Sequence, residues 1–297
     1  MAKLVECVPN VSEGRRGDVI DRMADAIRAT EGVRLLDRTS DVDHNRSVFT
    51  YAGEPEAVVR ATHALIDHAY REVDMNTHKG EHPRLGAVDV VPFVPLAGMT
   101  MEECVELAHR FGREVATRHQ VPVFFYAKAA MRPERVRLPD IRKPEYEGLA
   151  SVLETTHVPD AGPKRLHPTA GAIVVGARPF LIAFNIELDS TDLKLAQRIA
   201  KEIRESSGGL PAVQAKGFTL TDPPRVQVSM NLLDHTVTSL ATVWREVGTR
   251  ASAAGVKVLR GELIGLIPLD AVLEVAADSL RLDVFTRDRV IESHFLE

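Results

Sequence analysis

One short segment of the chain concentrates side chains that can move protons and hold anions. Residues 76–86 read Asn-Thr-His-Lys-Gly-Glu-His-Pro-Arg-Leu-Gly, with two histidines, a carboxylate, a lysine and an arginine between His78 and Arg84. Imidazole titrates near neutral pH, so either histidine is a candidate general acid or base. A charged, solvated loop is the alternative interpretation. The glycines and the proline fix a specific backbone path, however, and this favours a functional loop.

The same segment contains a pattern found in zinc hydrolases. His78-Lys-Gly-Glu-His82 matches H-x-x-E-H, which works on a helix because residues four apart then share a face. Gly80 interrupts the motif, and Pro83 drives His82 toward extended geometry. We therefore expect no metal. A zinc hydrolase that uses His78, Glu81 and His82 stays as a remote alternative.

The charged neighbours of His82 indicate an acidic small molecule as substrate. A carboxylate such as Glu81 can fix the tautomer of a nearby histidine. Arg84 can hold a substrate carboxylate through a bidentate pair.

A second cluster of basic residues lies in a loop shaped by glycines and prolines. Residues 160–171 read Asp-Ala-Gly-Pro-Lys-Arg-Leu-His-Pro-Thr-Ala-Gly and carry Lys164, Arg165 and His167. Composition leaves two interpretations open: a linker between domains, or an anion-holding loop beside a cleft between the two halves. The chain has no glycine-rich phosphate-binding motif and no nucleophile elbow, and neither cysteine has a basic setting.

The overall composition excludes several classes of protein. Lys and Arg number 37 against 42 Asp and Glu, a formal net charge of -5, which argues against nucleic acid as a partner. A hydrophobic fraction of 44% with 27% charged residues is typical of a globular protein. No apolar run is long enough to span a membrane, and the first residues do not resemble a signal peptide. We therefore expect a cytoplasmic protein without a membrane partner.

The hydrophobic pattern predicts an α/β (α+β) fold in which mixed or antiparallel sheets pack against helices. Helices are expected at 18–29, 54–72, 101–119, 145–154, 192–205, 237–253 and 270–277. Strands are expected at 4–8, 33–36, 47–51, 88–94, 121–126, 172–175, 180–188, 213–220, 226–231 and 256–259.

The proline-rich segment 132–168 is expected to be mostly loop and to connect two subdomains, 1–170 and 171–297. Ser190 or Thr191 should cap the helix that follows. The histidines outside the two loops, His44 among them, fall on predicted helix faces or in linkers, where we expect surface roles.

Four strings, in the same order along nearly the whole chain, resemble the glutamate formimidoyltransferases. They are Leu4-Val-Glu-Cys-Val-Pro-Asn-Val-Ser-Glu-Gly14, Gly80-Glu-His-Pro-Arg-Leu-Gly86, Phe180-Leu-Ile-Ala-Phe-Asn185 and Asn231-Leu-Leu-Asp234. The resemblance implies transfer of the formimidoyl group from N-formimidoyl-L-glutamate to N5 of tetrahydrofolate in histidine degradation, with release of glutamate. It also implies a homodimer and two α/β subdomains. Each would carry helices on the outer face of its sheet, and the sheets would face each other around the folate site.

The resemblance assigns residues to the two substrates. His82, in the Gly-Glu-His-Pro-Arg string, corresponds to the catalytic histidine of the family. The folate-contacting loop corresponds to Gly162, Pro163, Lys164, Arg165, Leu166, His167, Pro168, Thr169, Ala170 and Gly171. Candidates for holding the substrates' carboxylates are Arg46, Lys79, Arg84, Lys164 and Arg165, and Glu81 is a further binding candidate. Tetrahydrofolate is then a co-substrate, and no metal is expected.

The chemistry of such a transfer requires a proton donor. N5 of tetrahydrofolate attacks the formimidoyl carbon, and the glutamate nitrogen leaves the tetrahedral intermediate only when it is protonated. We assign this general-acid role to His82, whose imidazole can first take the N5 proton. Two alternatives stay open: a glutamate formyltransferase, which moves a formyl group between glutamate and folate, and a folate-binding protein without catalysis.

Overall fold

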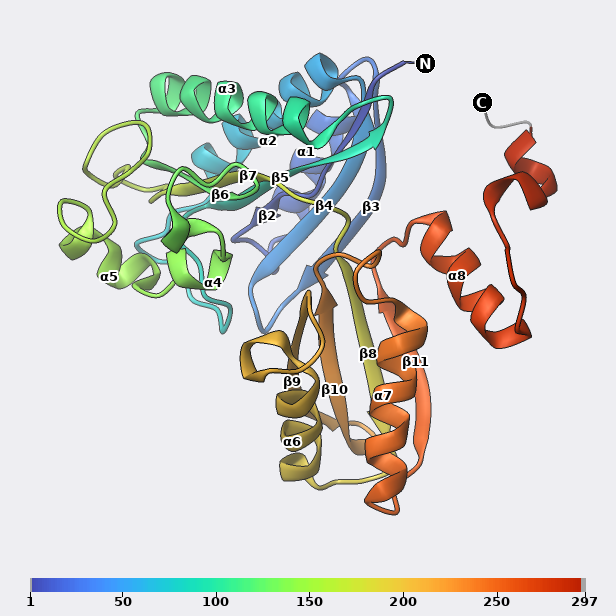
Figure 1. Cartoon of the computed structure of the whole chain (residues 1–297). Coiled ribbons are helices and arrows are strands. Elements are labelled where there is room, and N and C mark those ends of the chain that lie inside the picture. The colour runs from blue at the N-terminus through green and yellow to red at the C-terminus, as the bar shows by residue number, and fades with distance from the viewer. Residues whose placement is uncertain (1, 295–297) are drawn as a thin grey trace. The chain divides into compact units, whose positions relative to one another are not determined.

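The computed structural model describes residues 2–294 and divides after Pro179 into two compact units, each with its own hydrophobic core (Figure 1). The α/β class expected from the sequence is confirmed in both units. The expected division after residue 170 is too early. The reason is β7 (Ile173–Ala177), which pairs in parallel with two strands of the first sheet and is buried there along its whole length.

Unit 1 is built on a seven-stranded mixed sheet. β1 (Leu4–Cys7) and β2 (Asn10–Val11) follow one another between β4 (Arg46–Gly53) and β5 (Val88–Ala97). β3 (Val33–Asp41) pairs with β4, and β6 (Val123–Ala127) lies beyond β7. All pairings are antiparallel except those that β7 makes with β5 and β6. Because β2 is antiparallel to both β4 and β5, those two strands start at the same end of the sheet, which brings the segments before them together.

Three amphipathic helices cover one face of this sheet: α1 (Gly17–Arg28), α2 (Pro55–Glu72) and α3 (Met101–His119) (Figure 1). Their apolar faces pack onto strand residues such as Phe49 and Phe93, which are fully buried. α3 starts with a capping box, in which Thr100 Oγ1 accepts the Glu103 N–H at 3.2 Å and the Glu103 carboxylate accepts the Thr100 N–H at 3.0 Å.

Two short helices, α4 (Leu138–Ile141) and α5 (Glu145–Val152), pack against the opposite face near β6 and β7. The sequence predicted only the second of them, because a helix of four residues has no periodicity to detect. A buried ion pair between Arg135, in a 3₁₀ helix (Pro133–Arg135), and Asp160 fastens this segment to the sheet. The segment expected to connect domains is therefore part of unit 1.

Unit 2 is a four-stranded antiparallel sheet in the order β11 (Val258–Ile264), β8 (Ile182–Leu188), β10 (Pro224–Leu232) and β9 (Val213–Thr221). α6 (Leu193–Ile203) and α7 (Leu240–Ala253) pack on one face of it, and α8 (Leu269–Leu280) contacts α7. The cap of α6 is Asp192, whose Oδ1 accepts the Lys194 N–H at 2.9 Å, and not the expected Ser190 or Thr191.

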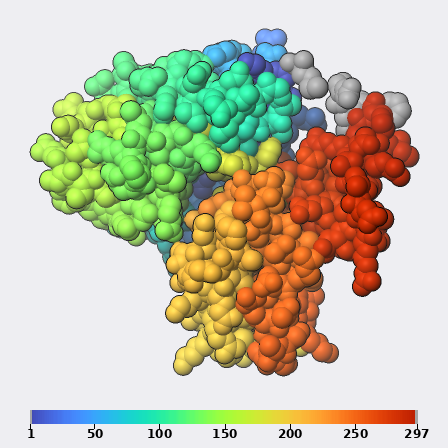
Figure 2. All heavy atoms as spheres, in the orientation of Figure 1, coloured from blue at the N-terminus to red at the C-terminus, as the bar shows by residue number. Residues whose placement is uncertain are grey.

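The last part of unit 2, coloured red in Figure 2, exposes many apolar side chains. It contains α8 and two 3₁₀ helices, Arg287–Arg289 and Ile291–His294. The exposed apolar residues there are Leu269, Val272, Leu280, Leu282, Val284 and Ile291. Among residues 2–294, no helix is both long and apolar enough to cross a membrane.

Candidate active site

Two segments of unit 1 meet at the end of the sheet where β4 and β5 begin. One is the turn between β3 and β4, and the other is the loop 74–87 between α2 and β5. Asn45 connects them: its Nδ2 donates to Lys79 O at 2.9 Å, and its Oδ1 accepts the Gly14 N–H at 2.9 Å. The backbones approach so closely that a Cβ on Gly80 would lie 2.3 Å from His44 O. Glycine at position 80 is therefore a packing requirement.

A small pocket forms where these segments meet the start of β5. Its lining residues are Ser12, His44, Asn45, Arg46, His78, His82, Arg84 and Asp89. The pocket unites His82 and Arg46, which the sequence proposed, with His44 and Asp89, which it did not.

His82 is held as a neutral base. Arg46 Nη1 lies 2.7 Å from His82 Nε2. Because a guanidinium only donates, Nε2 must accept this hydrogen bond, and the ring proton must sit on Nδ1. Burial lowers the pKa of His82 to about 2, and the positive charges of Arg46 and Arg142 act in the same direction. His82 can therefore act as a general acid only after it has first taken a proton.

Arg46 is a largely buried cation whose charge no carboxylate neutralises by direct contact. It forms no ion pair within the described part of the chain, and its Nε is buried without a hydrogen-bond partner. Burial lowers the pKa of Arg46, as does the charge of Arg142, yet a guanidinium stays protonated in proteins. A buried guanidinium with unused donors is suited to bind an anion.

Asp89 was missed by the sequence interpretation. It is buried at the start of β5, where its Oδ1 accepts the Leu85 N–H at 2.7 Å and its Oδ2 pairs with Arg142. A carboxylate between Val88 and Val90, in an otherwise apolar strand, was the available signal. Asp89 therefore holds the end of the loop at Leu85 and pairs with the charge of Arg142.

His44 was expected on the surface. Its side chain is 45% exposed, and it also lines the pocket. Its ring centroid lies 6.2 Å from that of His82, and its Nδ1 lies 3.0 Å from Asp41 Oδ2. The hydrogen bond that Asp41 accepts from the His44 backbone N–H, at 2.8 Å, holds the turn in shape.

Arg84 does not reach outward to a substrate. It is 5% exposed and forms a bidentate pair with Glu147 of α5, at 2.9 and 2.7 Å. Its Nε donates to His78 Nδ1 at 3.2 Å and its Nη2 donates to His78 O at 3.2 Å. These contacts use four of the five N–H groups of the guanidinium, so Arg84 ties the loop to α5 in this structure.

His78 is equally committed to the protein. Its Nδ1 accepts from Arg84, so its Nε2 carries the proton and donates to Asn45 O at 3.0 Å. A zinc ion could use His78 only if one of these hydrogen bonds broke. Across residues 2–294, no three His, Cys, Asp or Glu side chains gather in a way that could hold a metal ion. The donor set therefore does not fit the zinc-hydrolase alternative.

The side chains of Lys79 and Glu81 lie outside this pocket. Both residues are exposed and neither is among the lining residues. The Glu81 backbone N–H donates to Asp43 O at 3.3 Å, which ties the loop to the turn. The sequence left open which group orients His82, with a nearby carboxylate such as Glu81 as one candidate; in the structure, Arg46 contacts Nε2 of its ring.

The loop 162–171 belongs to unit 1 and is tied to both flanks of the His82 loop. Met75 N–H donates to Thr169 O at 2.8 Å, and Ala87 N–H donates to Ala170 O at 2.9 Å. Gly86 and Gly171 form an isolated β-bridge. Gly171 has φ +73°, and a Cβ there would lie 2.4 Å from Leu85 O, so the contact requires glycine.

The individual residues of this loop have different roles. The His167 ring accepts the Ala170 N–H at 2.9 Å and the Thr169 N–H at 3.3 Å, so it shapes its own loop. Leu166 packs against the core under α4 and α5. Lys164 and Arg165 are exposed. None of the loop residues 162–171, which include Gly162, Pro163 and Pro168, lines the pocket around His82.

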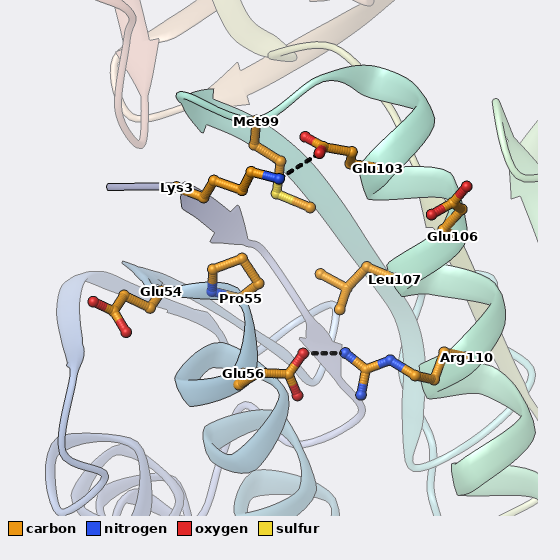
Figure 3. A pocket seen from close by; sticks show the side chains of 9 residues that line it. All are labelled: Lys3, Glu54, Pro55, Glu56, Met99, Glu103, Glu106, Leu107 and Arg110. Atoms are coloured by element: carbon orange, nitrogen blue, oxygen red, sulfur yellow. Dashed lines mark hydrogen bonds and ion pairs between the residues drawn. The ribbon is translucent and has the colours of Figure 1, made fainter. Parts of the chain in front are cut away.

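A second, larger pocket of unit 1 lies between the start of β1, α2 and α3 (Figure 3). Its lining residues are Lys3, Glu54, Pro55, Glu56, Met99, Glu103, Glu106, Leu107 and Arg110. Lys3 pairs with Glu103 and Arg110 pairs with Glu56, and further glutamates remain (Figure 3). Among the described residues that line it, both cations are paired with glutamates, in contrast to Arg46 in the pocket around His82.

Comparisons with known proteins cover the whole chain. The family model described as Formiminotransferase domain, N-terminal subdomain, matches residues 4–178, and the model described as Formiminotransferase domain matches residues 183–285. These two matches divide where the two units divide.

Curated relatives match at high identity. The chain is 41% identical to Glutamate formimidoyltransferase of Streptococcus pyogenes serotype M1, with 100% of both chains covered. It is 41% identical to the protein of the same name from Thermoplasma acidophilum, over 97% of this chain and 96% of that protein. It is 46% identical to Formimidoyltransferase-cyclodeaminase of Rattus norvegicus, over 93% of this chain and 52% of that protein. The chain thus spans about half the length of the rat relative.

Proposed function

Because the chain belongs to the formiminotransferase family of enzymes, we propose that it transfers the formimidoyl group of N-formimidoyl-L-glutamate to N5 of tetrahydrofolate. This reaction releases glutamate and belongs to histidine degradation and one-carbon metabolism. The observation that carries the proposal is the neutral His82 beside Arg46, a largely buried cation that has no carboxylate partner among residues 2–294. A base next to an anion-binding group is what proton transfer on an acidic substrate needs.

His82 carries one proton through the reaction. The amine N5 attacks the formimidoyl carbon, a C–N bond forms while the C=N bond of the formimidoyl group becomes single, and His82 takes the proton that N5 loses. The imidazolium then gives this proton to the glutamate nitrogen, the C–N bond to glutamate breaks as the C=N bond re-forms, and glutamate leaves as an amine. The low affinity of His82 for protons in its buried site makes it a strong donor in the second step. No step is assigned to a metal.

Positive charge for the anionic substrates comes from two places in unit 1. Arg46 lies inside the pocket, with the charge of Arg142 nearby. Lys164 and Arg165 lie exposed on the loop 162–171, which we propose contacts tetrahydrofolate. The backbone hydrogen bonds between this loop and residues 75 and 87 support the proposal, because they connect the loop directly to the segment that carries His82.

One assay tests the function. Purified protein is mixed with tetrahydrofolate and formimidoylglutamate, and the folate product is followed spectroscopically, with formylglutamate as donor in a parallel reaction. We expect turnover of formimidoylglutamate and loss of turnover in His82→Ala. The matched control is His294→Ala, which removes an exposed histidine of unit 2 and should leave the rate unchanged. Turnover of formylglutamate alone would establish a formyltransferase instead.

We also propose that the enzyme is a cytoplasmic homodimer. Both cysteines are free thiols, which suits a reducing compartment. The exposed apolar residues on and after α8, such as Leu280, Val284 and Ile291, support an interface between copies of the chain. Light scattering of the purified protein should give the mass of a dimer, and Leu280→Asp with Val284→Asp should reduce it. A monomer at micromolar concentration would contradict this part of the proposal.

A further inference from the structure

The contact between Arg46 and His82 is incompatible with the step that His82 must perform. Nε2 has a single lone pair, and the guanidinium of Arg46 occupies it at 2.7 Å. Nδ1 already carries the ring proton. His82 can therefore accept a proton from a substrate amine at Nε2 only after Arg46 has moved away.

Arg46 is held weakly enough to move. Its contact with His82 is a single hydrogen bond to a neutral acceptor, its Nε has no partner, and it forms no ion pair with residues 2–294. Arg84, in the same pocket, is by contrast fixed by two hydrogen bonds to Glu147 and two to His78. A carboxylate offers a guanidinium two charge-assisted hydrogen bonds and competes well with one neutral imidazole.

The donor substrate places a carboxylate where Arg46 can use it. In N-formimidoyl-L-glutamate, the α-carboxylate and the nitrogen that carries the formimidoyl group are bonded to the same carbon. A group that contacts His82 is therefore suited to bind the α-carboxylate while His82 acts at the neighbouring reaction centre.

We propose that Arg46 is a positioning residue that opens His82 in response to the substrate. The α-carboxylate of the donor takes the Arg46 guanidinium, and His82 Nε2 is released to accept the N5 proton and to pass it to the departing glutamate nitrogen. His82 can then accept a proton only when a carboxylate is bound to Arg46. This inference rests on the proposed function, since it presumes that His82 relays the proton.

The charges around His82 determine how binding of a carboxylate to Arg46 should change the pKa of His82. Arg46 at the start of β4, His44 in the adjacent turn and Arg142 after α4 all disfavour the imidazolium. Asp89 in β5 is paired with Arg142, and Asp41 at the end of β3 contacts His44. A bound carboxylate neutralises Arg46, so it should raise the pKa of His82 by at least about one unit.

Nuclear magnetic resonance of protein with ¹⁵N-labelled histidine tests this directly. His82→Gln assigns the His82 signals, which in the wild type should show a proton on Nδ1 and an accepting Nε2. L-glutamate should shift the titration of His82 upward, whereas 4-aminobutyrate, which keeps the γ-carboxylate but lacks the α-carboxylate, should not. Unchanged His82 signals with L-glutamate, or equal shifts with both compounds, would overturn the inference.

Kinetics of Arg46→Gln provide the second readout. The variant should lower kcat/KM for formimidoylglutamate by about 10- to 100-fold while the KM for tetrahydrofolate changes by less than about twofold. The acid limb of its pH–rate profile should move to higher pH, because His82 loses a neighbouring positive charge. Arg46→Lys, which keeps the charge, should restore part of the rate and leave that limb near its wild-type position.

The outcomes separate this inference from the proposed function. If His82→Ala retains full turnover, the proposal that His82 transfers the proton is wrong, and so is the positioning role of Arg46 that depends on it. If His82→Ala is inactive but Arg46→Gln has the wild-type pH profile, only the role of Arg46 is overturned. If Arg46→Gln does not fold, the comparison of L-glutamate with 4-aminobutyrate on the wild type decides the question.

Discussion

Arg46 and Arg84 line the same pocket of unit 1 and are bound in opposite ways. Arg84 meets Glu147 in a bidentate pair and also contacts His78, whereas Arg46 donates to the His82 ring and has no carboxylate partner among the described residues. His78 and His82 differ in parallel, since His78 has both ring nitrogens engaged by fixed protein groups. The comparison teaches that two arginines of one pocket differ in how many of their hydrogen bonds the protein itself satisfies, and this difference makes Arg46 the better candidate for binding a ligand.

The largest effect is expected when the two histidines, His82 and His78, are replaced. His82→Ala should lower kcat by about 10²- to 10⁴-fold, the range for a positioned acid–base group, with the KM for tetrahydrofolate little changed. His78→Gln should affect folding stability more than kcat in a well-folded sample. Steady-state kinetics and urea unfolding of both variants measure the contrast. Equal losses of kcat would show that the two histidines share one role.

At the arginines, the comparison predicts effects of different size on stability. Arg84→Met leaves His78 Nδ1 and the Glu147 carboxylate without their donor, and should lower the free energy of unfolding by about 2–4 kcal/mol. Arg46→Met removes a buried charge that forms no ion pair with residues 2–294, and should change the free energy of unfolding by less than about 1 kcal/mol. Urea denaturation at pH 7 compares them. A larger loss for Arg46→Met than for Arg84→Met would reverse the assignment.

The free energy of unfolding should depend on pH because His82 is neutral in the folded chain. Its pKa is about 2 in the folded chain and near 6.5 in an unfolded one, so below about pH 6.5 only the unfolded chain binds this proton. The free energy of unfolding therefore falls as pH decreases. Between pH 7 and 5, the wild type should lose about 2 kcal/mol more than His82→Gln. Urea unfolding at both pH values measures it, and equal losses would mean that His82 is not held neutral.

The smallest expected effect on stability lies in the loop 162–171, which we propose contacts tetrahydrofolate. Lys164→Ala combined with Arg165→Ala removes two exposed cations and should alter the free energy of unfolding by less than about 0.5 kcal/mol. The same variant should raise the KM for tetrahydrofolate, with a smaller difference from the wild type at high salt. Gly171→Ala is the matched structural variant, since it should destabilise the loop without removing charge. An unchanged KM in the double variant would remove both cations from folate binding.

The fold was predictable where local signals are strong. The bounds predicted for α3 agree with the structure. A Thr100–Glu103 capping box starts this helix, and a residue in the left-handed conformation follows its end. β7 was assigned to the wrong half because a five-residue apolar strand carries no information on which sheet it joins. That choice is made by pairing with β5 and β6, which lie far away in the sequence.

Part of the candidate site was likewise predictable from the sequence. His82 followed from the composition of its loop and from the family resemblance, and the pocket contains it. The partner of Arg84 did not follow, because Glu147 lies 63 residues away on a helix that the sequence placed in a linker. Whether an arginine is free for a substrate depends on such distant partners, so spacing alone cannot separate Arg46 from Arg84.

The bridge between Gly86 and Gly171 joins the two loops into one cooperative element. Residues 75, 87 and 172 all donate backbone hydrogen bonds across it, to Thr169, Ala170 and Leu85. These amide protons should therefore exchange with solvent in a single opening event rather than one at a time. A ligand that binds only one of the loops 74–87 and 162–171 should then slow amide exchange in both. Binding at one loop would thus stabilise the other without any change in backbone conformation.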